Sequence, residues 1–163
     1  MDRLLSQLSE TVPTDSGAAI VHGDYRLDNT IIDLSPDVPS LVAVLDWELS
    51  TLGDPLADLA MTLTYWHDRG DFERGKIPVA AGLTTHPGFP TGRELAEKYA
   101  ILTGRDLSQL QFYLAFSAMK LAVILEGVHA RYLGGQTISD GYEGAGAAVP
   151  ALVATGLRAM HTL

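Results

Sequence analysis

The sequence predicts an α+β fold that is mainly helical. The chain has 163 residues, of which 47% are hydrophobic, and this suits one domain with a buried core. Short apolar runs separated by polar turns fill the first third, whereas apolar residues recur at helical spacing afterwards. Within one domain, 1–163, we therefore expect an N-terminal helix or linker (1–17), a loop-rich β region (18–53) and a helical subdomain (54–163).

Three short strands are expected in the β region. They are the apolar runs Ala18–Val21, Thr30–Asp33 and Leu41–Leu45. Turn residues separate them, such as Asp28-Asn29 and Ser35-Pro36-Asp37. Runs this short cannot build a large sheet.

A helix is expected to begin at Pro55. Asp54 is a favourable N-cap, and proline suits the first helical position. The apolar residues that follow repeat at helical spacing: Leu56, Leu59, Ala60, Leu63 and Trp66. Both tryptophans, Trp47 and Trp66, are expected to be core residues.

Three further helices are expected towards the C-terminus. The segment 91–94 has the sequence of a capping box, which opens a helix through Leu102 with Gly104 as its stop. A long helix is predicted over 107–133, and the Ala-rich tail 142–163 is also expected to be helical.

The most apolar segment of the long helix is Phe112–Leu125. It is shorter than a bilayer span of about 20 residues, and it contains Lys120. We therefore expect a buried helix at this segment.

Composition limits the partners of the chain. The 11 Lys and Arg residues against 20 Asp and Glu residues give a net charge of −9, so neither nucleic acid nor an anionic membrane is expected as a partner. The chain has no cysteine, which excludes disulfides and thiolate metal sites within it. The N-terminus lacks a secretory signal pattern, and a cytoplasmic location is the simplest expectation.

Polar residues with catalytic potential gather around the strand ends. The segment HGDYRLDN, 22–29, lies between two apolar strands, and the strand 41–45 leads directly to Asp46. Loops fixed at both ends often carry catalytic residues. The side chains of Asp24, Asn29 and Asp46 can therefore converge.

Phosphoryl transfer needs this set of groups. It uses a carboxylate that orients or deprotonates the attacking hydroxyl, and oxygen ligands for Mg²⁺. Protein kinases carry them in H-R-D-x-x-x-x-N followed by D-F-G. Asp24 and Asn29 have the same offset, and Asp46 follows after a hairpin-length interval. Ordinary turn chemistry of Asp and Asn is the alternative, but it predicts neither the histidine nor the spacing.

Other phosphate and metal motifs fit less well. Metallophosphoesterases use Gly-Asp-x-x-Asp, but Asp28 follows Asp24 one residue too late, and no later Gly-Asn-His occurs. Arg26 interrupts the alternating ligands of a calcium loop. The sequence has neither a G-x-S-x-G elbow nor a Walker A motif.

HGDYRLDN followed by DWELSTLGDPLADLA resembles the aminoglycoside and choline phosphotransferase family, whose fold is related to protein kinases. The sequence of these two motifs is most similar to that of the phosphotransferase domain fused to some acyl-CoA dehydrogenases. The resemblance covers roughly residues 18–133. The resemblance implies the C-terminal lobe of a kinase-like fold, in which 18–53 carries the catalytic and metal loops. It also implies use of Mg²⁺ with ATP or another nucleoside triphosphate.

The resemblance assigns four residues to the chemistry. It implies that Asp24 is the catalytic base and that Asn29 and Asp46 are metal ligands. Arg26 occupies the place where protein kinases keep a lysine near the transferred phosphate, so it is expected to stabilise the transition state. The alternative for Arg26 is a solvated or salt-bridging side chain.

Three further residues are expected to support the site. The resemblance implies that His22 braces the catalytic loop and that Asp58 tethers it from the following helix. A carboxylate that interacts only with the helix dipole is the alternative for Asp58. Glu48 lies just beyond Asp46 and is open to a role towards metal, water or substrate.

A kinase also needs a glycine-rich strand pair, a strand lysine and a glutamate partner. Residues 1–17 contain neither a glycine-rich strand pair nor a lysine. We therefore expect the nucleotide-binding N-terminal lobe to be absent. The isolated chain is expected to transfer phosphate weakly or not at all. No nucleotide-contacting residue is assigned. Three alternatives stay open: a fragment or natural half of a two-lobed enzyme, a chain completed by a separate lobe, and a non-catalytic binding or assembly module. A homodimer is one way to cover the face that the absent lobe would expose. The expected acceptor is a hydroxyl of a small molecule, and the resemblance favours a hydroxyacyl compound.

Overall fold

The computed structural model describes residues 1–14, 17–35, 37–71, 82–136 and 144–161. In these residues the chain forms five α-helices and two antiparallel sheets of two strands each. The α+β, mainly helical fold class that the sequence predicts is confirmed.

The strands lie in two separate pairs. β1 (Ala19–Val21) pairs with β4 (Thr51–Gly53), and β2 (Thr30–Asp33) pairs with β3 (Ser40–Val44). The three predicted strands are present, each within one residue of its predicted ends. β4 was not predicted, because three residues are too few to show an alternating pattern. Its pairing with β1 brings the chain back beside the start of the 22–29 loop.

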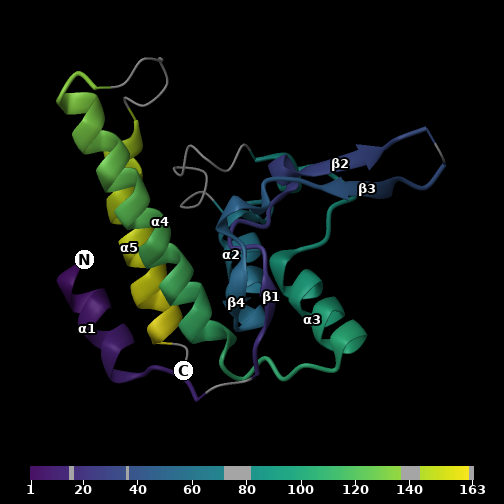
Figure 1. Ribbon diagram of the computed structural model, residues 1–163, viewed down its shortest axis with the longest axis horizontal. Helices are drawn as coiled ribbons and strands as arrows, with labels where there is room; N and C mark the ends of the chain where they lie inside the picture. Colours follow the sequence, from purple (N-terminus) through teal and green to yellow (C-terminus); the bar gives the residue numbers. More distant parts are fainter. Residues whose placement is uncertain (15–16, 36, 72–81, 137–143, 162–163) are drawn as a thin grey trace.

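The first long helix of the C-terminal part is α2 (Pro55–Tyr65). As predicted, Asp54 caps it by accepting a hydrogen bond of 2.8 Å from the backbone N–H of Leu56, and Pro55 occupies the first turn. Its buried apolar residues pack against α3 (Gly92–Thr103) and the long helix α4. α2 is thereby fixed in the middle of the molecule (Figure 1).

The ends of α3 also follow the prediction. Thr91 and Glu94 form the capping box, and Gly104 ends the helix with a φ of 68°. Gly104 tolerates this left-handed conformation because it has no Cβ.

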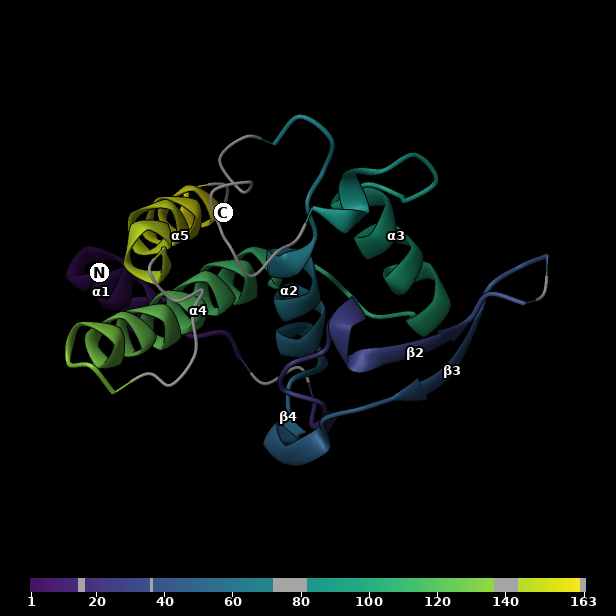
Figure 2. The same ribbon diagram turned by 90° about the horizontal axis from the view of Figure 1, so that it is seen from above.

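α4 (Leu110–Leu133) begins three residues later than predicted. Asp106 accepts hydrogen bonds from the backbone and hydroxyl of Ser108, and the N–H of Leu110 donates to Leu107. Residues 107–109 therefore form a turn that precedes the helix. α4 packs along α5 (Ala145–Met160), and both views show the two helices side by side (Figures 1 and 2).

α5 lies within the predicted C-terminal helix, and residues 142–143 and 162–163 fall outside the described part of the chain. Close approach of α4 and α5 depends on Gly146, where a Cβ atom would lie 2.6 Å from the ring of His129. At the other end of the pair, α1 (Asp2–Glu10) buries Leu4 and Leu8 against both helices.

The buried-helix prediction holds for one face of α4. Ala115, Ala118 and Leu121 are at most 2% exposed, whereas Phe116 and Val123 are 45% and 51% exposed on the other face. Among the described residues, α4 is also the helix whose length and apolar character would be enough to cross a membrane. Its packing against α1, α2 and α5 makes it the central element of the helical part.

The two tryptophans differ from the prediction that both are core residues. Trp66 is buried, and its Nε1–H donates to the carbonyl of Pro90 at 2.8 Å. The prediction is wrong for Trp47, which is 49% exposed. Its ring covers the imidazole of His22 at a centroid distance of 4.8 Å, and its Nε1–H bonds to Val44. Trp47 is held at the surface because it follows the turn at the end of β3.

Candidate active site

The 22–29 loop leaves β1 and enters β2 through a short 3₁₀ helix, Leu27–Asn29. Gly23 has a φ of 84°, and a Cβ atom there would lie 2.7 Å from the carbonyl oxygen of Leu49. Only glycine combines this left-handed backbone with so close an approach. The start of the loop is therefore fixed against the segment that precedes β4.

His22 joins the loop to the end of β3. Its Nε2 lies 2.7 Å from the carbonyl oxygen of Leu45, and its Nδ1 accepts a hydrogen bond from the N–H of Asp24 at 3.3 Å. With Nδ1 as the acceptor, Nε2 is the ring nitrogen placed to donate to Leu45. The side chain, only 3% exposed, lies where the predicted brace would be.

Asp58 binds the same loop from α2. Its carboxylate accepts the backbone N–H groups of His22 at 2.5 Å and Gly23 at 2.8 Å. Interaction with the helix dipole alone does not account for these two bonds. One turn further along α2, the hydroxyl of Thr62 donates to the carbonyl of Tyr25 at 2.8 Å, so two turns of one helix hold the loop.

A third support comes from Lys120, for which the sequence predicts no role at the site. Its ammonium group donates to the carbonyl of Gly23 at 2.8 Å from the middle of α4. The single charged residue of the apolar segment Phe112–Leu125 was the available signal, because a charge in such a place needs a polar partner.

Asp24 and Asn29 are in contact. The Asn29 amide nitrogen donates to the Asp24 carbonyl at 2.9 Å and to its carboxylate at 3.2 Å. Because the amide nitrogen of Asn29 makes both contacts with Asp24, the amide oxygen of Asn29 is directed away from Asp24. The five-residue offset predicted this neighbourhood.

Asp46 lies next to Asn29 through strand pairing. The N–H of Leu45 donates to the carbonyl of Asn29 at 2.8 Å, and Asp46 is the following residue. Asp46 has a φ of 65°, the one positive value at a described residue other than glycine. Such a conformation costs of order 1–3 kcal/mol and clusters at functional sites.

The donor set of Asn29 and Asp46 fits Mg²⁺. No group of three or more His, Asp or Glu side chains in the described ranges could hold a metal ion. Mg²⁺ does not need such a cage, since it is usually held by one or two carboxylates together with phosphate oxygens and water. One carboxylate and one carboxamide oxygen suit that mode of binding.

Arg26 is surrounded by two carboxylates and a ring. Its Nε lies 3.6 Å from the Asp24 carboxylate, its Nη1 lies 3.5 Å from Asp28, and its guanidinium carbon lies 4.9 Å from the ring centroid of Tyr65. Tyr65 lies at the end of α2. Burial, followed by the negative charge of Asp24, raises the pKa of Tyr65 to about 12.

Sequence reasoning missed Tyr65. It lies seven residues after Asp58, so both occupy the same face of α2. That spacing was the available signal. Glu48, by contrast, lies on the exposed 3₁₀ helix Trp47–Leu49, and within the described chain no hydrogen bond or ion pair joins it to the other predicted site residues.

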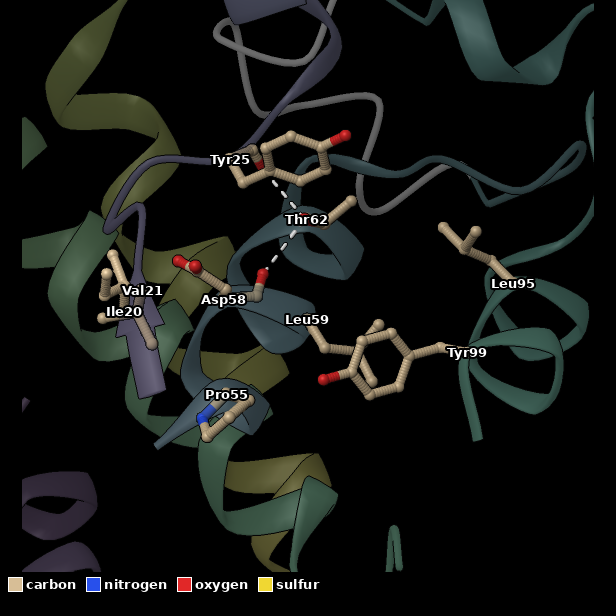
Figure 3. Close-up of a pocket in the computed structure, with 9 residues that line it drawn as sticks. All are labelled: Ile20, Val21, Tyr25, Pro55, Asp58, Leu59, Thr62, Leu95 and Tyr99. Atoms are coloured by element: carbon tan, nitrogen blue, oxygen red, sulfur yellow. Dashed lines mark hydrogen bonds between the residues drawn. The ribbon is translucent and has the colours of Figure 1, made fainter. Parts of the chain in front are cut away.

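A cavity of about 300 Å³ borders the loop between β1, α2 and α3 (Figure 3). Figure 3 shows the β1 residues on one side, the α3 residues on the other and α2 between them. Its lining residues are Ile20, Val21, Tyr25, Pro55, Asp58, Leu59, Thr62, Leu95 and Tyr99. Its walls are mostly apolar, with a carboxylate and hydroxyl groups as polar points. Such a composition is typical of small-molecule sites, and the volume is at their lower end.

Comparison with known proteins gives consistent matches. Residues 1–97 match the model of the phosphotransferase enzyme family. The chain is 39% identical over 144 residues to acyl-CoA dehydrogenase family member 10 of Mus musculus, and 36% identical over 146 residues to family member 11 of Homo sapiens. These alignments cover 85% and 86% of this chain but only 13% and 18% of the two relatives.

A solved structure shares the fold. A Ralstonia eutropha protein assigned as an aminoglycoside phosphotransferase superposes with a TM-score of 0.77 at 35% sequence identity. The superposition covers 99% of this chain and 48% of that protein, so this chain spans about half of its length. The family model covers more than half of the present chain and agrees with the structural neighbour in fold. The chain belongs to the phosphotransferase enzyme family.

Proposed function

We propose that this chain supplies the catalytic and metal-binding residues of an ATP- and Mg²⁺-dependent phosphotransferase that acts on a hydroxyl group of a small molecule. The observation that carries the proposal is the linked pair of contacts at Asn29. Its side chain bonds to Asp24, and its backbone pairs with Leu45, the residue before Asp46. A candidate base and two candidate metal ligands thus lie together in a member of a phosphotransferase family.

Each residue has one role in this proposal. Asp24 accepts the proton of the acceptor hydroxyl, and Arg26 stabilises negative charge on the transferred phosphoryl group. Asn29 and Asp46 hold Mg²⁺, which supplies neutralisation of the charge on the phosphates. His22 and Asp58 keep the loop in place, so that the side chain of Asp24 is oriented before the acceptor arrives.

A hydroxyacyl compound is the acceptor that we favour. The curated relatives are named as acyl-CoA dehydrogenases, whereas the structural neighbour is assigned to aminoglycosides. The apolar walls of the cavity beside Tyr25 suit an aliphatic chain better than a polycationic sugar.

Calorimetric titration with Mg-ATP tests the metal site. The wild-type chain is expected to bind in a magnesium-dependent manner, and Asp46→Ala is expected to lose that dependence. Asp33→Ala is the matched control, because Asp33 is an exposed carboxylate on the hairpin away from the site. In any acceptor assay that gives turnover, Asp24→Asn should lower the rate by about 10²–10⁴. Equal binding by wild type and Asp46→Ala would contradict the metal role of Asp46, whereas no binding by either would mean that this chain, alone, is half an enzyme and needs a nucleotide-binding lobe.

A non-catalytic binding or assembly module is the second candidate, and exposed apolar residues favour it. The β2–β3 hairpin projects from the body in both views (Figures 1 and 2). On this hairpin and on the β1–β4 pair, the exposed apolar residues are Ile20, Ile31, Ile32, Leu34, Val38, Leu41, Val42 and Leu52. A separate nucleotide-binding lobe or a second copy of the chain would cover such residues. Sedimentation of the purified chain distinguishes a homodimer from a monomer, and nucleotide binding by the monomer would favour the catalytic proposal.

A further inference from the structure

The arrangement of Arg26 differs from an ordinary salt bridge. In a close arginine–carboxylate pair the N–O distances are about 2.7–2.9 Å and often bidentate. Here the distances are 3.6 Å to Asp24 and 3.5 Å to Asp28, one for each carboxylate. The Nε atom is buried and has no hydrogen-bond partner in the described part of the chain. The Arg26 guanidinium therefore lies close to the Asp24 carboxylate, but its N–H groups do not form hydrogen bonds to that carboxylate.

The ring of Tyr65 accounts for this position. It lies under the guanidinium at 4.9 Å from the ring centroid to the guanidinium carbon, a distance suited to a cation–π contact. The same ring packs against the apolar cluster between α4 and α5, which contains Leu121, Leu125 and Leu152. A packed core thus fixes the ring, and the ring in turn limits where Arg26 can lie.

Tyr65 is also close enough to Asp24 to feel its charge. The negative charge of the Asp24 carboxylate contributes to the raised pKa of Tyr65, and the Oδ2 atom of that carboxylate accepts a hydrogen bond from Asn29. The ring of Tyr65 therefore contacts Arg26, and its phenol lies in the electrostatic field of Asp24.

We infer that Tyr65 is a positioning residue, which keeps Arg26 and Asp24 apart so that the guanidinium can meet a phosphate and the carboxylate can meet an acceptor hydroxyl. The inference deepens the proposed function and rests on it for the identity of the two ligands. If Arg26 closed onto Asp24 as a bidentate pair, each would neutralise the other, and neither would be available. Tyr65 prevents that closure by supporting the guanidinium from below.

Side-chain NMR of the full chain tests the geometry without any ligand. Protons of Arg26 above the ring are expected to resonate upfield in the wild type and in Tyr65→Phe, because both keep the ring. In Tyr65→Leu the upfield shift should be lost, and the Arg26 Nε–H signal should move downfield with slower exchange as it bonds to Asp24. Tyr99→Leu is the matched control, since Tyr99 is a half-buried tyrosine that packs against a different cluster and should leave Arg26 unchanged.

Two results would overturn the inference. One is the absence of an upfield shift in the wild type, which needs no variant to fold. The other is an Arg26 signal in folded Tyr65→Leu that matches the wild type. Circular dichroism establishes folding, and if Tyr65→Leu does not fold, the comparison of wild type with Tyr65→Phe decides whether the ring alone holds Arg26.

Mg-ATP affinity adds a functional measurement. Tyr65→Phe is expected to bind within about threefold of the wild type, whereas Tyr65→Leu and Arg26→Gln should each bind about tenfold more weakly, which is the size of one charge-assisted hydrogen bond. Loss of the magnesium-dependent binding in Asp46→Ala tests the proposed function separately, and if the wild type alone does not bind Mg-ATP, the NMR comparison still decides the role of Tyr65. Wild-type affinity in Tyr65→Leu would contradict that role.

Discussion

Replacing Asp58 by alanine is expected to destabilise the fold at the candidate active site. The carboxylate accepts hydrogen bonds from the backbone N–H groups of His22 at 2.5 Å and Gly23 at 2.8 Å. Hydrogen bonds to a charged group contribute about 1.5–3 kcal/mol each. Because the site is only partly buried, water can replace part of this loss. We therefore expect the free energy of unfolding to fall by about 2–4 kcal/mol, which for this chain length lowers Tm by about 5–15 °C.

Urea unfolding followed by circular dichroism measures this loss, and amide hydrogen exchange locates it. Exchange at His22 and Gly23 should accelerate more than exchange in α5, because those two amides lose their acceptor. Asp33→Ala is the control, since Asp33 also accepts two hydrogen bonds, from the N–H and hydroxyl of Ser35, but on the exposed hairpin. The reasoning is refuted if the two variants lose the same stability, or if exchange at His22 and Gly23 does not change.

Three further predictions concern the same loop. Gly23→Ala should lower the free energy of unfolding by about 2–4 kcal/mol, because residue 23 has a positive φ and a Cβ atom there would lie 2.7 Å from the carbonyl oxygen of Leu49. Gly104 also has a positive φ, but open space surrounds it. Gly104→Ala should therefore cost only about 1 kcal/mol in the same urea titration. Since the pKa of Tyr65 is about 12 in the folded chain and about 10 in an unfolded one, the stability from this group is complete below pH 10 and is lost as the pH rises towards 12; a stability–pH profile of Tyr65→Phe as steep as that of the wild type over this range would contradict the assignment. Lys120→Met should cost about 1–2 kcal/mol and loosen the Gly23 carbonyl, seen as faster exchange in the loop, and unchanged exchange would argue that the bond is dispensable.

Helix ends were predictable because the interactions that fix them are local. The cap of α2 by Asp54 and the capping box of α3 by Thr91 and Glu94 each join residues two or three positions apart. Such signals are complete within a short stretch of sequence. The late start of α4 also has a local cause, the Asp106–Ser108 turn, which the apolar pattern alone did not reveal.

Strand β4 and the position of Trp47 depended on distant contacts. Three residues gain a strand conformation only by pairing with β1, which lies some thirty positions earlier in the chain. Trp47 is held at the surface by its contacts with His22 and Val44. Hydrophobicity alone indicated a core position, which the turn after β3 does not allow.

The candidate active site likewise combines features that are local in sequence with contacts that depend on tertiary packing. The sequence by itself predicted which residues carry phosphoryl-transfer chemistry, because the spacing of Asp24 and Asn29 is a local property, and it identified the family through that motif. His22 and Asp58 were expected as supports, but only the tertiary structure revealed the supports that come from more distant helices. Lys120 meets Gly23 across 97 positions of sequence, and Tyr65 meets Arg26 from α2. No short-range pattern encodes these contacts, because they exist only after α2 and α4 have packed and have brought their polar side chains to the loop.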